Sequence, residues 1–223
     1  MTDTILLVDK PKGITSFDCI RILRREMGIK KMGHSGTLDP LASGLMLIGL
    51  QEGTKKLADL IGLPKTYIAE ILLGKKTTTG DLEGDVLKEI EVKDIDLNKV
   101  KEVLDDMVGE IDLPVPAYSA IKVKGQALYK KARAGQQVET PIKTMEIHSV
   151  KIVQTFPFEN YFILKIEIDV KSGTYIRSIA EEVGARLGLP ATIKELRRTR
   201  IGDYHIKDAQ PLNMKNWHKK RGS

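Results

Sequence analysis

Residues 33–44 read Gly-His-Ser-Gly-Thr-Leu-Asp-Pro-Leu-Ala-Ser-Gly, a run that holds three glycines, one aspartate and one proline. Glycine permits positive φ angles and close approach of other backbone, so the run predicts a shaped loop rather than a helix or strand. Pro40 fixes its own φ and favours an extended conformation for Asp39. The apolar residues 45–50 that follow have the length of a buried strand. The sequence therefore predicts a lone carboxylate, Asp39, on a stiff loop that is anchored to a buried strand.

The rest of the chain mixes strand-like and helix-like patterns without a regular order. Apolar or alternating runs predict strands at residues 5–8, 45–50, 66–73, 145–153 and 161–170. Helical periods with capping residues predict helices at about residues 17–27 (capped by Thr15 or Ser16), 55–61 (capped by Thr54), 97–107 (capped by Asp96), 176–187 and near Thr192. The polar, glycine-containing residues 77–85 are expected to form a loop. This irregular order predicts the α+β class, with a mixed, mainly antiparallel sheet flanked by helices.

The composition is that of a globular protein with a basic character. The 223 residues suffice for one large domain or for a domain with a small appendage. Hydrophobic residues make up 41% and charged residues 30%, which allows an ordinary core. The net charge of +6 favours a polyanionic partner, most simply nucleic acid, although many mildly basic proteins bind none.

Several function classes are disfavoured by the residues that are scarce. A single cysteine, Cys19, allows no intramolecular disulfide and lies in a helical pattern, where a packed residue is expected rather than a nucleophile. Four scattered histidines and one cysteine do not predict a zinc site. The first residues do not resemble a signal peptide, and no apolar stretch approaches about 18 residues. We therefore expect a cytoplasmic protein with no membrane contact.

Residues 118–133 combine positive charge with aromatic rings. Tyr118 and Tyr129 lie among five basic residues: Lys122, Lys124, Lys130, Lys131 and Arg133. This mixture is typical of a protruding basic arm that binds nucleic acid. The alternative interpretation is a solvated helix face.

Five segments occur together in an order that matches a known family. They are Val-Asp-Lys-Pro-Lys-Gly at residues 8–13, the 33–44 run, Lys-Thr-Tyr at 65–67, Ser-Gly-Thr-Tyr-Ile-Arg at 172–177 and Leu-Arg-Arg at 196–198. Each segment is a weak signal alone, whereas the ordered set is specific. Over residues 5–204 the chain strongly resembles the bacterial tRNA pseudouridine-55 synthases of the TruB family.

The resemblance implies a fold and a reaction. The implied fold is the pseudouridine synthase fold, with a catalytic domain over residues 1–205 and an inserted basic thumb at about residues 118–142. The implied enzyme is an isomerase of tRNA modification that converts uridine 55 in the T arm of tRNA to pseudouridine without a cofactor or metal. The glycosidic C–N bond breaks, the uracil turns within the site, and a C–C bond forms through C5. A stacked base cannot be reached in place, so it must first flip into a pocket.

Three residues match the family's catalytic positions. Asp39 matches the essential aspartate, the nucleophile. Arg177 matches the arginine that pairs with this aspartate. Because arginine keeps its charge when buried, it can keep the aspartate ionised where burial alone would protonate it. Tyr67 matches the tyrosine that stacks on the flipped uracil and serves as general base. Taken without the resemblance, Asp39 before a proline reads as a turn residue, and Tyr67 as packing.

Four further residues match positions around the bound base. By resemblance, Tyr175 borders the base, Leu196 is an apolar wall of the pocket, and His34 enters the T loop to fill the space that the base leaves. Asp81 is expected to support His34 and Arg177. The alternatives are ordinary packing for Tyr175 and Leu196, a solvated loop histidine for His34, and a turn residue for Asp81.

The resemblance also implies which cations contact the RNA backbone. The thumb lies over the RNA in the family, so its basic residues are expected to bind phosphates: Lys122, Lys124, Lys130, Lys131 and Arg133. Arg197, Arg198 and Arg200 are expected to border the mouth of the site. Binding of this kind weakens steeply with salt.

Many family members carry an additional C-terminal RNA-binding domain, for which residues 205–223 are too few. Residues 206–223 are expected to form a short basic tail instead. Two alternatives to a stand-alone synthase stay open: the catalytic subunit of a guide-RNA pseudouridylation particle, and a protein that binds and refolds tRNA. We expect tRNA as the partner, no obligate protein partner, and a monomer.

Overall fold

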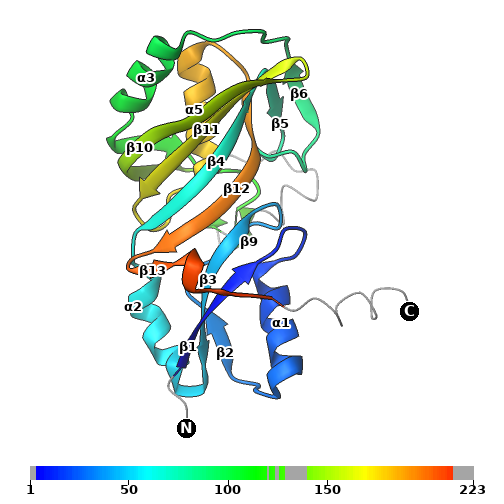
Figure 1. Cartoon of the computed structure of the whole chain (residues 1–223), viewed down its shortest axis with the longest axis vertical. Coiled ribbons are helices and arrows are strands. Elements are labelled where there is room, and N and C mark those ends of the chain that lie inside the picture. The colour runs from blue at the N-terminus through cyan, green and yellow to red at the C-terminus, as the bar shows by residue number, and fades with distance from the viewer. Residues whose placement is uncertain (1–3, 120, 124–125, 129–139, 213–223) are drawn as a thin grey trace, which may run out of the picture. The chain divides into compact units, whose positions relative to one another are not determined.

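The strands of the chain form a mixed, mainly antiparallel sheet with helices beside it, which confirms the predicted α+β class (Figure 1). The computed structural model describes residues 4–119, 121–123, 126–128 and 140–212. The chain divides into two compact units, Met1–Ile68 with Leu196–Ser223, and Ala69–Glu195. The boundary falls inside β4 (Lys65–Leu73) and β12 (Ala191–Ile201), so each of these strands contributes residues to both units.

In the first unit the strand order is β14–β1–β3–β12, and β2 and β13 pair outside this path. The bounds are β1 Thr4–Lys10, β2 Met32–His34, β3 Ser43–Leu50, β13 Tyr204–His205 and β14 Gln210–Pro211. β1 and β2 run antiparallel to β3, whereas β12 runs parallel to it. Every residue of β3 is buried, which confirms the buried strand predicted after the loop.

The helix α1 (Ser16–Met27) begins and ends with the signals that its sequence predicts. Thr15 and Asp18 form a capping box: the Thr15 hydroxyl accepts from the Asp18 N–H (3.0 Å), and the Asp18 carboxylate accepts from the Thr15 N–H (2.8 Å). Gly28 ends the helix with a left-handed φ of 68°. Cys19 is fully buried in α1, and burial raises the pKa of its thiol to about 11, as suits a packed residue.

The second helical segment of this unit differs from its prediction. Residues Gln51–Lys56 form a 3₁₀ helix, η1, which passes directly into α2 (Leu57–Ile61). Thr54 lies inside η1, and its hydroxyl donates to the Gln51 carbonyl (2.7 Å). The prediction that Thr54 caps α2 is therefore wrong, because its side chain bonds backward along the chain instead of forward.

In the second unit the strand order is β4–β11–β10–β7, and β12 adjoins β4. The bounds are β7 Gly109–Pro114, β10 Ile142–Phe158 and β11 Tyr161–Val170. β10 runs antiparallel to both β11 and β7. The helix α3 (Leu97–Asp106), capped by Asp96, contacts α5 and β10, and α5 (Ile176–Leu187) contacts β7 (Figure 1). The strands predicted in this unit and the helices predicted at residues 97–107 and 176–187 are thus present, and β10 is longer than predicted.

Three strands with residues in this unit, β5 (Lys75–Thr77), β6 (Val86–Glu89) and β12, were not predicted from the sequence. Residues 77–85 connect β5 to β6, an antiparallel pair whose strands are short. The helix expected near Thr192 is wrong, because residues 191–201 are the strand β12. Thr192 and Ile193 are buried and β-branched, which suits a strand, and Lys194 pairs with Glu70 of β4 (3.1 Å).

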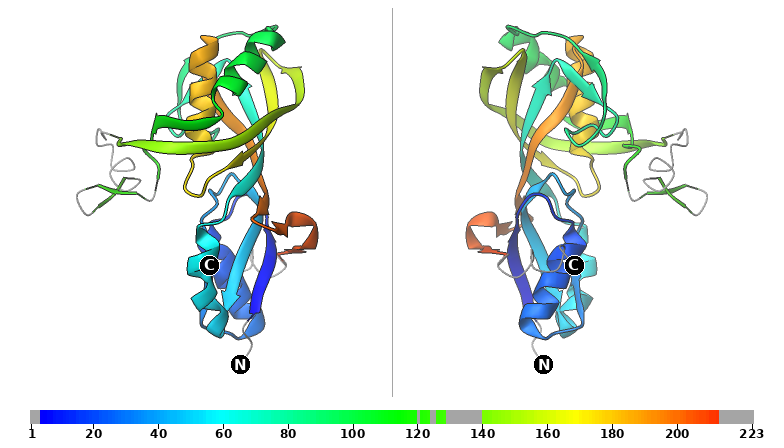
Figure 2. Two further views of the ribbon diagram at one scale, coloured as in Figure 1. Left: turned by 90° about the vertical axis from the view of Figure 1, so that its left-hand side faces the viewer. Right: turned by 90° about the vertical axis from the view of Figure 1, so that its right-hand side faces the viewer.

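The predicted thumb is described only in part. β8 (Lys122–Val123) and β9 (Gln126–Ala127) form a short antiparallel pair. Figure 2 shows this pair beyond the ends of β7 and β10, away from α3 and α5. Lys122 lies in β8, whereas Lys124, Lys130, Lys131 and Arg133 fall outside the described residues. Among the helices that are described, none has the length and apolar character needed to cross a membrane.

Candidate active site

The loop that carries Asp39 lies between β2 and β3, and its backbone is held on both sides of that residue. Ser16, the first residue of α1, is 2% exposed. Its hydroxyl accepts from the Leu38 N–H (2.8 Å) and donates to the Leu38 carbonyl (3.1 Å). One buried side chain thus satisfies both polar backbone atoms of the residue before Asp39. Asp39 itself is half-buried, and its carbonyl accepts from the Ala42 N–H (3.1 Å).

On the other side of Asp39, the carbonyl of Pro40 is the point of attachment. It accepts from the Gly13 N–H (2.8 Å) and from the Lys10 ammonium (3.4 Å). Lys10 is fully buried, and its Nζ also donates to the carbonyls of Ile14 (2.8 Å) and Pro11 (3.0 Å). A buried ammonium needs such acceptors. The 8–13 segment and the 33–44 run, which are separate motifs in the sequence, are therefore joined in the first unit.

His34 lies at the end of β2, at the start of this loop, and is half-buried. Its Nδ1 accepts from the Gly36 N–H (3.3 Å), which leaves Nε2 as the protonated nitrogen of the neutral ring. Burial, together with the positive charge of Arg198, lowers the pKa of His34 from its usual 6.5. At neutral pH the side chain is therefore an uncharged imidazole whose Nε2–H can donate.

Tyr67 and Leu196 belong to the same unit as Asp39. Tyr67 lies on β4 and is 8% exposed, and Leu196 lies on β12 and is 7% exposed. Lys65, two residues before Tyr67, is buried, and its Nζ donates to the carbonyls of Ile61 and Leu63 (2.6 Å each). Burial and the Arg198 charge lower the pKa of Lys65 to about 8. The exposures of Tyr67 and Leu196 fit either a pocket wall or core packing.

Arg197 and Arg200, which the resemblance places at the mouth of the site, are bound within the first unit. Arg197 donates through both terminal nitrogens to the Asp9 carboxylate (2.7 and 3.1 Å) and also to the Ser43 hydroxyl (3.2 Å). Arg200 donates through Nε to the Thr66 hydroxyl (3.0 Å). The Arg197 side chain is 42% exposed, so its bidentate pair with Asp9 leaves it within reach of solvent.

Arg198, the residue between Arg197 and Thr199 on β12, differs from Arg197 in that it is only 1% exposed. Its Nε donates to the Leu45 carbonyl (2.8 Å), and one terminal nitrogen donates to the Gly36 carbonyl (3.3 Å). The expectation that Arg198 contacts an RNA phosphate is wrong for this structure, because the guanidinium is enclosed and is bound to backbone carbonyls. Arg198 is instead part of the framework of the 33–44 loop.

In the second unit, Arg177 lies near the start of α5 and is 5% exposed. Its guanidinium donates to the carbonyls of Thr79 (2.8 Å) and Tyr118 (3.0 Å), and one terminal nitrogen lies 3.9 Å from the Asp81 carboxylate. Carbonyl acceptors from two separate segments hold the group in one orientation. Arg177 is therefore a fixed, charged donor, as a partner for a carboxylate should be.

Asp81 is anchored in the turn between β5 and β6. Its carboxylate accepts from the Thr79 hydroxyl (2.5 Å) and from the Glu83 N–H (3.1 Å), and its carbonyl accepts from the Thr77 hydroxyl (2.6 Å). Asp81 also bridges to Ile193 of β12. The residue is 4% exposed, so it is more than a solvated turn residue. Its place beside Arg177 fits the supporting role that the resemblance implies.

Tyr175 is the N-cap residue of α5 and is half-buried. Its backbone N–H donates to the Met145 sulfur (3.4 Å), and the Lys143 ammonium lies 5.7 Å from its ring centroid. An aromatic ring of this kind, half-buried at a helix start, has a flat face on which another ring can stack.

The structure thus assembles two groups of predicted residues. Asp39, His34, Tyr67 and Leu196 lie in the first unit, and Arg177, Asp81 and Tyr175 lie in the second. The Asp81–Arg177 proximity is present, whereas the Asp39–Arg177 pair joins residues of different units and stays a prediction. Sequence reasoning missed three contributions to the loop: the hydrogen bonds of Ser16, those of Lys10, and the inward orientation of Arg198. Lys10 and Arg198 stand inside recognised segments, which is the one signal that could have pointed to them.

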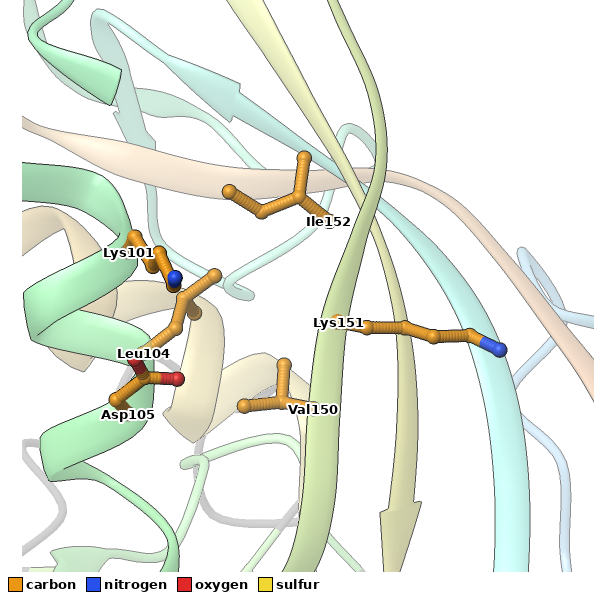
Figure 3. A pocket seen from close by; sticks show the side chains of 6 residues that line it. All are labelled: Lys101, Leu104, Asp105, Val150, Lys151 and Ile152. Carbon is orange, nitrogen blue, oxygen red and sulfur yellow. The ribbon is translucent and has the colours of Figure 1, made fainter. Parts of the chain in front are cut away.

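A cavity of about 220 Å³ lies between α3 and β10 in the second unit, and Figure 3 shows the side chains that line it. Leu104 and Asp105 line it from α3, Val150 and Ile152 point toward the helix, and Lys151 points away. Of the predicted site residues that the structure describes, none lines this cavity. Within the described residues, no group of three or more His, Cys, Asp and Glu is arranged to hold a metal ion.

Comparisons with known proteins point to one family. The sequence model of the TruB family pseudouridylate synthases (N terminal domain) matches residues 24–176. The chain is 38% identical to tRNA pseudouridine synthase B of Leifsonia xyli, over 93% of this chain and 70% of that protein. It is 40% identical to the protein of that name from a Mycobacterium species (94% and 70%) and 39% identical to that of Geobacillus kaustophilus (92% and 73%).

Solved structures support the fold. The chain aligns with a chain of an H/ACA RNP bound to a substrate RNA containing 2'-deoxyuridine, with a TM-score of 0.69 and 23% identity. It aligns similarly with a chain of a Cbf5-Nop10-Gar1 complex, with a TM-score of 0.67 and 25% identity. Each alignment covers 93% of this chain but only 50% and 52% of those chains, so the present chain spans about half their length. The fold, the loop around Asp39 and these matches agree. The chain therefore belongs to the TruB family of pseudouridylate synthases, which are isomerases.

Proposed function

We propose that this chain converts uridine to pseudouridine at position 55 in the T arm of tRNA, and that Asp39 is the nucleophile. The observation that carries the proposal is the backbone attachment of Leu38 and Pro40, which fixes the one carboxylate of the 33–44 loop from both sides. Catalysis by a positioned group requires that kind of order. The relatives named tRNA pseudouridine synthase B supply the substrate class.

The proposed reaction begins with extrusion of the target base, at a cost of a few kcal/mol. Asp39 attacks the nucleotide and the glycosidic C–N bond breaks. The uracil then turns, a C–C bond forms through C5, and the bond between Asp39 and the nucleotide breaks, which restores the free carboxylate. Tyr67 stacks on the ring and removes the proton from C5, while the uracil nitrogen released from the sugar gains a proton, so the reaction is a balanced isomerisation. The low exposure of Tyr67 is compatible with this role, and its place in the same unit as Asp39 is the further support.

Charge stabilisation is assigned to the second unit. A carboxylate that is enclosed in a pocket with the flipped uracil tends to take up a proton, because desolvation disfavours its charged form. Asp39 therefore needs a cation beside it, and Arg177 is the proposed cation. Its guanidinium is buried and held by two carbonyls, with Asp81 nearby. Tyr175 and Leu196 are the proposed walls around the base. His34, neutral and able to donate through Nε2, is proposed to occupy the space that the base leaves.

The proposed enzyme acts alone on tRNA, with no cofactor, guide RNA or protein partner. The test is to incubate the purified chain with an unmodified tRNA transcript and to map modified positions, with a transcript that carries cytidine at position 55 as substrate control. Asp39→Asn should abolish pseudouridine formation and retain tRNA binding. Asp59→Asn, which alters an exposed carboxylate of α2 in the same unit, is the matched control and should keep wild-type turnover.

Other outcomes decide between the remaining functions. Turnover that appears only when a guide RNA is added would favour the catalytic subunit of a guide-RNA particle. Binding and refolding of tRNA with no turnover in the wild type would favour an RNA-binding protein. Retained turnover in Asp39→Asn would refute the nucleophile assignment alone.

A further inference from the structure

Arg198 is a buried arginine that makes no ion pair in the part of the chain that the structure describes. Burying a charge is costly unless it is fully hydrogen-bonded, so the position of such a residue needs a reason. The partners of its guanidinium are the carbonyl of Gly36, in the loop before Asp39, and the carbonyl of Leu45, in β3 after that loop.

The same residue also fixes the loop through its backbone. Arg198 stands opposite Gly44 in the parallel pairing of β12 with β3. Gly44 has a φ of 113°, and a Cβ there would lie only 2.7 Å from the Arg198 nitrogen. The end of the loop thus passes so close to Arg198 that only glycine fits. Side chain and backbone of one residue therefore set where the loop leaves Gly36 and where it enters β3.

We propose that Arg198 is the positioning residue of the Asp39 loop: its guanidinium ties Gly36 to Leu45, and its backbone fixes the path of the chain at Gly44. This inference rests on the proposed function in taking Asp39 as the catalytic group. It goes further in assigning an enclosed, inward-facing arginine to the catalytic step rather than to RNA binding. A second, electrostatic part concerns His34 and Lys65, whose pKa values are lowered first by burial and then by the Arg198 charge.

Two substitutions separate the two parts of the proposal. Arg198→Lys keeps a positive charge but lacks the planar guanidinium that reaches two carbonyls at once, whereas Arg198→Gln removes the charge as well. Both variants should lower kcat on tRNA at least tenfold with KM changed less than threefold, because the loop is displaced while the RNA-binding surface is intact. Only Arg198→Gln should raise the pKa of His34, measured by NMR titration of its imidazole.

Arg25→Gln is the matched control, since Arg25 is an exposed arginine of α1 in the same unit, and it should change neither kcat nor the His34 titration. Unchanged kcat in both folded variants would overturn the positioning role. A rise in KM with kcat intact would also overturn it, because that pattern means RNA binding. An unchanged His34 pKa in Arg198→Gln would overturn the electrostatic part.

The readouts also separate this inference from the proposed function. If the wild-type chain has no activity on tRNA, the proposed function fails, and NMR of the loop still decides the tie between Gly36 and Leu45. In that case both Arg198 variants should shift the backbone amide signals of residues 36–45, and Arg25→Gln should not. If Arg198→Gln does not fold, Arg198→Lys alone is used for the kinetic and NMR tests of the link between Gly36 and Leu45. The effect of the Arg198 charge is then tested by the pKa of Lys65, which should stay at about 8 in Arg198→Lys.

Discussion

The hydroxyl of Ser16 hydrogen-bonds to both polar backbone atoms of Leu38, at 2.8 and 3.1 Å, and Leu38 immediately precedes Asp39. Helix α1 and the loop of the proposed nucleophile are therefore joined by one side chain. Replacing this hydroxyl group therefore tests the attachment of the loop to the helix directly.

Ser16→Ala should destabilise the protein and slow the reaction. It leaves the buried N–H and carbonyl of Leu38 without partners, which costs about 2 kcal/mol of unfolding free energy. Urea unfolding measures the loss, and kcat on tRNA should fall with it because Asp39 is less well placed. Ser35→Ala is the control: the Ser35 hydroxyl is buried in the same loop and has no hydrogen-bond partner in the described residues, so its removal should cost less than about 0.5 kcal/mol. Equal effects from the two variants would contradict the role given to Ser16.

Gly44→Ala should be among the most damaging small substitutions in the first unit. The added Cβ would meet the Arg198 backbone, and the φ of 113° disfavours any other residue, so we expect a loss of about 3 kcal/mol or more. Gly28→Ala at the end of α1 has a left-handed φ but open space around it, and about 1 kcal/mol is expected there. Thermal and urea unfolding of the two variants compare the clash with conformational strain alone.

Lys65 should make stability rise with pH in an alkaline window. Burial and the Arg198 charge lower the pKa of Lys65 from 10.5 to about 8 in the folded chain. Between these values the unfolded state binds more protons than the folded state, so the unfolding free energy increases with pH, by about 3 kcal/mol over the whole window. The difference between wild type and Lys65→Met, followed from pH 7.5 to 10.5, isolates this contribution. Lys56→Met, at an exposed position of η1, should show no such slope.

The thumb cations should account for much of the salt dependence of tRNA affinity. Neutralising the residues expected to bind phosphates should flatten the dependence of log affinity on log salt, by about one for each phosphate that loses its cation. The variant replaces five residues by glutamine: Lys122, Lys124, Lys130, Lys131 and Arg133. Its control removes the same charge from exposed lysines elsewhere: Lys55, Lys93, Lys99, Lys101 and Lys151. A slope that changes equally in both would assign the effect to net charge instead of to the thumb.

Local signals were enough to predict much of the fold. The capping box of Thr15 and Asp18, the Asp96 cap of α3 and the glycine after α5 each act within one turn of helix, so the sequence carries them completely. β12 was misread because its charged residues look like an exposed helix, whereas Lys194 finds its partner in Glu70, 124 residues away along the chain. The strands of the β5–β6 pair were missed because they are only three and four residues long, and because every residue of β6 is exposed.

The site residues also fall into those that the sequence could identify and those that it could not. Motif residues such as Asp39 and Arg177 could be named from the sequence because the resemblance carries them. The inward turn of Arg198 could not, because an Arg-Arg pair on a strand places one side chain on each face, and only the sheet pairing decides which face is enclosed. Ser16 was visible only as a capping residue, since its contact with Leu38 depends on where the loop packs.

The attachment of Leu38 to the first turn of α1 has a consequence for local opening. An amide in a surface loop ordinarily exchanges its hydrogen with solvent deuterium quickly, but the Leu38 amide can exchange only when its hydrogen bond to Ser16 opens. Fraying at the start of α1 opens that bond as surely as movement of the loop does. The stability of the first helical turn therefore contributes to how often the proposed nucleophile departs from its reactive position.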